Sequence, residues 1–186
     1  SEMAIGLGAM FGFKFPRNFN APYLASSVTD FWRRWHISLS SWFRDYLYIP
    51  LGGNRLSALR TYSNLFIVFV LCGLWHGASW NFLIWGVFHG TVLSIERAGL
   101  SALINWLWAP LRHLYLIFIV LVSWVFFRAE TLTDAIDYLA SMFTFNFGNV
   151  PFEFLDAISV DVVVALLFGL LLSTPVYRKC FLFPLN

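Results

Sequence analysis

Charged residues are scarce in this sequence. Only 12% of its 186 residues are Asp, Glu, Lys or Arg, about half the share of a typical soluble domain. The net charge of +2 is too small for a protein that binds nucleic acid. Hydrophobic residues make up 59% of the chain and aromatic residues 20%, which is more apolar surface than a soluble domain of this length can bury. The composition therefore predicts a polytopic membrane protein surrounded by lipid, with no nucleic-acid partner.

Motifs for bound metals and for serine hydrolases are also missing. The two cysteines stand alone in apolar segments, and the four histidines show no H-x-x-H or H-E-x-x-H spacing. His76 and His89 would lie about 20 Å apart on one continuous helix, too far for one metal ion. No G-x-S-x-G motif marks a nucleophilic serine. We therefore expect no metal and no other bound cofactor.

Apolar runs and turn residues divide residues 1–186 into segments of a single partial membrane domain. The apolar run at 1–15 is shorter than the roughly 20 residues that cross a bilayer, and no basic leader precedes it. We therefore expect a truncated span there, in a chain that is the C-terminal part of a longer protein. The other predicted segments are an amphipathic segment at 26–55, a broken pair of spans at 62–97, an interfacial helix and a span at 100–128, an outer acidic segment at 129–159 and a last span at 160–177.

One continuous amphipathic helix is predicted over residues 26–47. Thr29 or Asp30 is placed to cap its N-terminus, and turn residues at 49–55 end it. Its apolar residues recur at steps of three and four, as in a helix at a membrane interface or across a bundle. This stripe consists of Phe31, Trp35, Leu39, Trp42 and Tyr46. Other stripes and apolar runs predict interfacial helices over 100–111 and 132–143 and spans over 114–127 and 160–174.

The longest apolar segment is interrupted by His76-Gly77-Ala78-Ser79. It forms either one long tilted helix or two helices with an irregular centre protected by protein. Residues 1–60 hold seven of the twelve basic residues, so the positive-inside rule places the basic loops in the cytoplasm. The segment 62–97 must then enter and return on the same side, which favours a break near His76. The sequence thus predicts an all-α fold, a polytopic membrane helix bundle with kinked or broken spans and amphipathic interfacial helices.

Histidines are the main candidates for chemistry. His76 either bonds a carbonyl that the break leaves free or is a base in a cavity, because imidazole can take a hydroxyl proton near neutral pH. Ser79 and Asn81 are candidates to orient it, because they are near in the sequence. His36 is an interfacial residue or part of the same site. The remaining candidates have simpler readings: His89 as a packing residue, His113 as an interface residue, and Arg44-Asp45 as a surface pair or a contact to a substrate phosphate.

Several long motifs carry a resemblance to a known family. Residues 30–40 (DFWRRWHISLS), 42–55 (WFRDYLYIPLGGNR), 73–78 (GLWHGA) and 124–129 (WVFFRA) resemble the membrane-bound O-acyltransferase family. The similarity is to its bacterial branch of alginate O-acetylation and D-alanyl-lipoteichoic-acid transfer proteins, and it covers most of residues 3–143. It implies that His76 is the catalytic histidine in a tunnel and that His36, the second motif histidine, lines its path. Trp75, Ser79, Asn81, Arg44 and Asp45 are the further candidates to line the tunnel or contact substrate.

The resemblance also implies a function. We expect a multi-pass enzyme of the bacterial inner membrane that takes an acyl group, expected to be acetyl, from a cytoplasmic thioester of coenzyme A or an acyl carrier protein. The acceptors would be hydroxyls of a secreted or cell-surface polysaccharide, or a periplasmic or extracellular acyltransferase partner that relays the group. His76 would be the general base, and the full-length protein would be required. Two other hypotheses are a membrane transporter or channel with a histidine proton relay, and a non-catalytic scaffold of an acylation complex.

Overall fold

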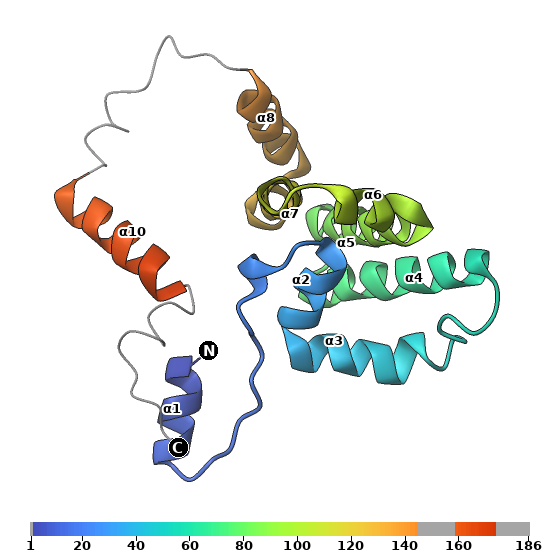
Figure 1. The fold of residues 1–186 in the computed structure, drawn as a ribbon, viewed down its shortest axis with the longest axis horizontal. Coiled ribbons are helices and arrows are strands. Elements are labelled where there is room, and N and C mark those ends of the chain that lie inside the picture. The colour runs from blue at the N-terminus through green and yellow to red at the C-terminus, as the bar shows by residue number, and fades with distance from the viewer. Residues whose placement is uncertain (1, 145–158, 174–186) are drawn as a thin grey trace. The chain divides into compact units, whose positions relative to one another are not determined.

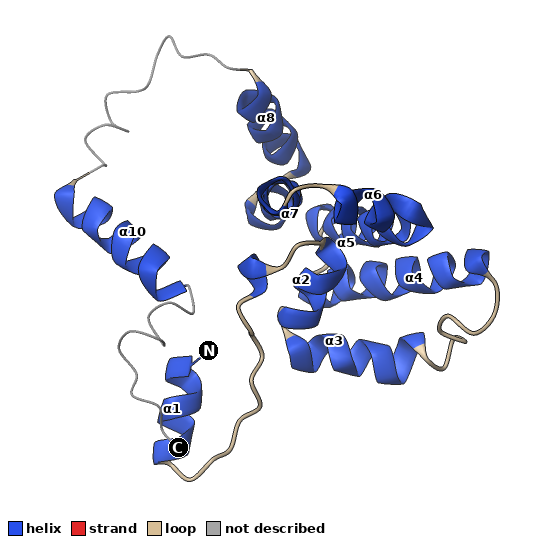
Figure 2. Ribbon diagram, viewed as in Figure 1, coloured by secondary structure: helices blue, strands red, loops and turns tan. Residues whose placement is uncertain are grey.

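The computed structural model describes residues 2–144 and 159–173. The chain divides into two compact units, residues 1–140 and 141–186. All regular elements in the two described ranges are helices, without a strand between them (Figure 2). Two of these helices, α4 (Ala58–His76) and α7 (Ala109–Arg128), are long and apolar enough to cross a membrane. The predicted all-α class with apolar spans is confirmed.

Helices follow one another along the first unit, with longer connections between α1 and η1 and between η2 and α4 (Figure 1). They are α1 (Glu2–Met10), η1 (Pro22–Leu24), α2 (Val28–Arg34), α3 (Ile37–Phe43), the π-helical turn η2 (Arg44–Tyr48), α4 (Ala58–His76), α5 (Trp80–Ile95), the π-helical turn η3 (Glu96–Leu100), α6 (Ser101–Trp106), α7 (Ala109–Arg128) and α8 (Leu132–Phe143), whose last residues belong to the second unit. The second unit contains α10 (Val160–Ser173).

The centre of the first unit is an antiparallel hairpin of α4 and α5. Its two helices touch backbone to backbone, because a Cβ at Gly73 would meet the carbonyl group of Phe82 and a Cβ at Gly86 would meet that of Phe69. Glycine at these two positions lets the helices approach this closely. The predicted break is present, since α4 ends at His76 and α5 begins at Trp80. Because the two helices are antiparallel, the end of α5 lies beside the start of α4.

The prediction of one continuous helix over 26–47 is wrong, because the helix is broken at His36. Trp35 is extended (φ −100°, ψ 130°) and His36 is left-handed (φ 45°, ψ 54°). The cause lies in the loop before α2: the N–H of Ile37 donates to the carbonyl of Asn18 at 2.9 Å, and the Asn18 side chain accepts from Ser38. These bonds replace those of a continuous helix. The cap is also different, since the side chain of Ser27 accepts from the N–H of Asp30 at 3.1 Å.

The helices that follow the hairpin begin and end at other residues than predicted. The stripe over 100–111 predicts one helix, but α6 already ends at Trp106, and Pro110 lies in the first turn of α7. Proline is tolerated there because its missing N–H would be unpaired in any case. The resulting α7 has 20 residues and is longer than the span predicted over 114–127. Helix α8 has the bounds that were predicted for it. The apolar run at the N-terminus forms α1 as far as Met10, and α10 ends at Ser173. The rest of the predicted acidic segment and last span lies outside the described residues.

A buried apolar cluster joins α2 to the hairpin and to α7. Val28 and Phe31 from α2 pack with residues of three other helices, among them Phe69 of α4, Leu93 of α5 and Leu116 of α7. A second cluster, Phe43 with Cys72 and Trp85, joins α3 to the same hairpin. The short helices α2 and α3 are therefore fixed against the hairpin, and with them the backbone of His36.

Candidate active site

An aromatic wall surrounds the imidazole of His76 at the end of α4. Its ring centroid lies 4.9 Å from that of Trp75, 5.2 Å from Trp85 of α5 and 5.1 Å from Phe127 of α7, each at a steep angle. The side chain is half-buried. No group in residues 2–144 or 159–173 forms a hydrogen bond with this ring, so the expected alternative of a bond to a freed carbonyl is not present there. The imidazole is left with nitrogens available to a ligand.

Trp75 connects this histidine to the other motif histidine. The ring of His36 lies 6.3 Å from that of Trp75 at 81°, so the one indole contacts both imidazoles. The Nδ1 atom of His36 is buried and has no hydrogen-bond partner in the described part of the chain. His36 and His76, which are far apart in the sequence, thus lie against the same side chain at the break of each helix pair.

Ser79 and Asn81 form hydrogen bonds that stabilise the helix break after His76. The Ser79 side chain caps α5 by accepting from the N–H of Asn81 at 3.1 Å. The side-chain amide of Asn81 is buried and donates to the carbonyl of Ala129 at 2.7 Å, just after α7. In the described residues neither side chain forms a hydrogen bond with His76, and a role of either in orienting it stays a prediction. Their bonds hold the start of α5 against the end of α7, where Phe127 faces His76.

Arg44 and Asp45 form the surface pair that the sequence predicted as one alternative. The guanidinium group of Arg44 donates to both carboxylate oxygens of Asp45, at 2.7 Å and 3.2 Å. This hydrogen bonding holds the pKa of Asp45 below its ordinary value. Both side chains are exposed, so the pair is weak as a stabilising contact.

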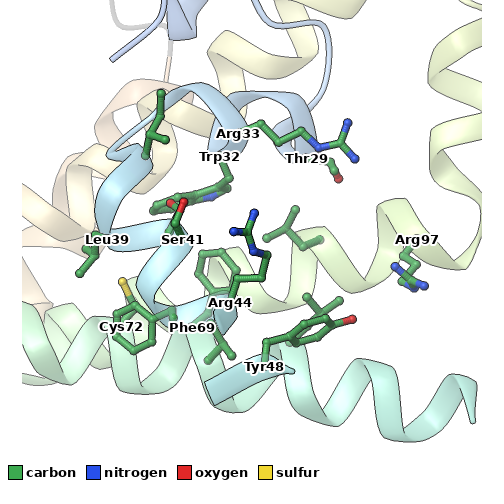
Figure 3. A pocket seen from close by; sticks show the side chains of 16 residues that line it. Thr29, Trp32, Arg33, Leu39, Ser41, Arg44, Tyr48, Phe69, Cys72 and Arg97 are labelled. Atoms are coloured by element: carbon green, nitrogen blue, oxygen red, sulfur yellow. The ribbon is translucent and has the colours of Figure 1, made fainter. Parts of the chain in front are cut away.

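Arg44 also lines a cavity of about 410 Å³ between α2, α3, η2 and the hairpin (Figure 3). Arg33 of α2 and Arg97 of η3 line it as well, and its apolar wall includes Phe69 and Cys72 of α4. Neither His36 nor His76 is among the lining residues. The cavity and the aromatic wall of His76 are therefore two separate features of the first unit.

Two polar arrangements were missed at the level of sequence. Glu96 is fully buried and accepts from the N–H groups of Val28 and Thr29, from the Thr29 hydroxyl and from the hydroxyl of Tyr115, at 2.7, 2.9, 2.6 and 3.2 Å. In the sequence, the feature that could have indicated this site is a single acidic residue at the end of the apolar segment 62–97. The other arrangement is the hydrogen bond that Trp32 donates to His89. His89 is buried, which agrees with its interpretation as a packing residue.

Comparison with known proteins decides the family. Residues 2–131 match the sequence profile of MBOAT, the membrane-bound O-acyltransferase family. The chain belongs to this family. The matched range includes His36, His76 and all residues of the cavity.

The chain is similar to curated proteins with three different names. The probable alginate O-acetylase AlgI of Azotobacter vinelandii is 56% identical over 146 residues, which are 78% of this chain and 29% of the relative. The peptidoglycan O-acetyltransferase of Helicobacter pylori is 40% identical over 97% of this chain and 36% of its own length. The teichoic acid D-alanyltransferase of Bacillus subtilis is 36% identical over 49% of this chain and 25% of its own. The chain thus spans about a third of the length of these relatives.

Proposed function

We propose that the full-length protein containing this chain is an integral-membrane O-acyltransferase in which His76 is the general base. The observation that carries this proposal is a half-buried imidazole at a helix break, without a hydrogen-bond partner in the described chain and walled by Trp75, Trp85 and Phe127. An imidazole in such a place can bind a hydroxyl group, and family membership supplies the class of reaction.

The proposed reaction is a direct transfer from a thioester to a hydroxyl group. A nitrogen of His76 takes the hydroxyl proton while the oxygen attacks the thioester carbonyl. The new C–O bond forms, the C–S bond breaks, and the thiolate leaves with the proton that the imidazole returns. The aromatic wall lowers the access of water, which would otherwise hydrolyse the thioester. His36, which also contacts Trp75, lines the path of one of the two substrates.

The proposed substrates are supported by the names of the relatives and by the distribution of basic residues along the chain. Relatives named for acetylation of alginate and of peptidoglycan support an acetyl group and a polysaccharide acceptor outside the cell, reached directly or through a partner acyltransferase. The basic loops of residues 1–60 support a cytoplasmic thioester donor, coenzyme A or a carrier protein, and a multi-pass location in the bacterial inner membrane.

The test is His76→Ala in the full-length protein, with acyl groups on the cell-surface polysaccharide measured by mass spectrometry. His113→Ala is the matched control, since His113 bonds the carbonyl of Ala25 at 2.9 Å, away from the aromatic wall. We expect acylation to be lost in the first variant and kept in the second, with both proteins inserted in the membrane. Normal acylation in variants of both His76 and His36 would instead favour a scaffold. Donor-independent, pH-dependent flux in liposomes would favour a transporter.

A further inference from the structure

The cavity beside the hairpin is surrounded by arginines from three different elements. Arg33 lies on α2, Arg44 on η2 and Arg97 on η3, and Figure 3 shows them on different sides of the same cavity. Arg33 and Arg97 have no ion-pair or hydrogen-bond partner for their guanidinium groups in the described residues. Unpaired guanidinium groups around one opening are suited to bind an anion, because each can donate two parallel hydrogen bonds to phosphate oxygens.

Acidic groups near the cavity neutralise only part of the positive charge of its three arginines. Asp45 is bonded to Arg44 but does not line the cavity. Glu96 lies behind the wall, where its carboxylate accepts from the lining residue Thr29 and from the N-terminus of α2. Among the described residues that line the cavity there is no aspartate or glutamate. The cavity therefore keeps an excess of positive charge.

The inner part of the cavity is apolar. One wall of the cavity comes from α4 and consists of Leu65, Val68, Phe69 and Cys72. Leu93 of α5 also lines the cavity. A small inorganic anion would leave these side chains without contacts. The combination of an arginine rim and an apolar interior fits an amphiphile, with a phosphate group at the rim and a hydrocarbon chain inside.

Aromatic residues next to the cavity indicate its depth in the membrane. Trp42 and Tyr46 lie on either side of Arg44 in the sequence, and their rings contact each other at 5.5 Å. Both are exposed, at 54% and 70%. Exposed tryptophan and tyrosine are typical of the headgroup level of a bilayer. The basic excess of residues 1–60 places this level on the cytoplasmic side, where the leaflet carries anionic lipids.

We propose that this cavity binds an anionic phospholipid of the cytoplasmic leaflet, with its phosphate group held by Arg33 and Arg97 beside the Arg44–Asp45 pair. Its hydrocarbon chain lies along the apolar wall of α4. Basic cavities between membrane helices on the cytoplasmic side are suited to such headgroups. The site goes beyond the proposed acyl transfer, because its lining includes neither His36 nor His76.

The experiment measures lipid binding to the purified full-length protein. Native mass spectrometry counts the lipids retained after exchange into detergent that contains either phosphatidylglycerol or phosphatidylcholine. The test variant is the double substitution Arg33→Gln with Arg97→Gln. The control, Arg55→Gln with Arg60→Gln, removes the same charge from exposed positions that do not line the cavity. Lipid binding is also measured in His76→Ala.

We expect the wild type, the control variant and His76→Ala each to retain one phosphatidylglycerol, with phosphatidylcholine bound much more weakly. The Arg33→Gln/Arg97→Gln variant should bind phosphatidylglycerol about 30-fold more weakly, from the contribution of two arginines near an anionic lipid. Equal retention in this variant and in the control overturns the proposal, as does equal binding of the two lipids. Displacement of the lipid by coenzyme A or pyrophosphate at micromolar concentration assigns the cavity to a soluble phosphate compound and also overturns it. Because binding is read in His76→Ala as well, the outcome does not depend on acyl transfer.

Discussion

The indole N–H of Trp32 donates to Nδ1 of His89 across 3.3 Å and joins α2 to the hairpin. His89 is only 2% exposed and lies among the rings of Trp32, Phe69 and Trp85. The bond fixes Nδ1 as the acceptor, so in the neutral ring the proton lies on Nε2. It links the helix that leads to His36 with the helix that follows the break at His76.

Replacing Trp32 with phenylalanine removes this donor and leaves Nδ1 of a buried histidine unpaired. We expect a loss of about 1–3 kcal/mol in the free energy of unfolding, measured by denaturant titration in detergent. Trp106→Phe is the matched control, because Trp106 is 84% exposed. Equal stability of the two variants would show that the bond contributes nothing.

Glu96→Gln should also destabilise the first unit. Four donors converge on the buried carboxylate, and the amide group of glutamine would turn its own N–H groups towards some of them. We expect a loss of about 2–3 kcal/mol and faster amide hydrogen exchange at Val28 and Thr29. Glu130→Gln, at an exposed position, should leave both measurements unchanged. Unchanged exchange at Val28 in Glu96→Gln would contradict the role of the carboxylate in fixing α2.

Gly86→Ala should separate the helices of the hairpin. The added methyl group would meet the carbonyl of Phe69, which is backbone and cannot turn aside. We expect a loss of about 1–3 kcal/mol in stability, as for other overpacked positions. Gly6→Ala is the control, because nothing lies within 4 Å of a Cβ there. A Gly86→Ala variant as stable as Gly6→Ala would mean that the hairpin is less tightly packed than described.

Features fixed by neighbouring residues could be predicted from the sequence, and those fixed by distant residues could not. The break after His76 follows from Gly77 and from Ser79, which caps the next helix. The break at His36 depends on Asn18, a loop residue whose bonds to Ile37 and Ser38 leave no periodic signal. The apolar stripe predicts one helix over 100–111, although Pro110 also fits the first turn of a helix, where it lies in α7.

The candidate site shows the same division. The motif histidines were visible in the sequence, but their common contact with Trp75 depends on how α2 and α3 pack against the hairpin. The partners of Glu96 lie 67 and 68 residues away, and the cavity combines arginines of three elements. Such arrangements arise only when the helices are packed.

The central claim is that His76 is the general base of acyl transfer. Its most direct test is the transfer rate of His76→Ala in membrane vesicles that contain the full-length protein, a labelled acyl donor and the cell's own polysaccharide, with and without added imidazole. We predict a rate on the order of 10²–10⁴-fold below that of the wild type, partly restored by imidazole because it supplies the missing base. A His76→Ala variant that transfers acyl groups at the wild-type rate without imidazole would contradict the claim.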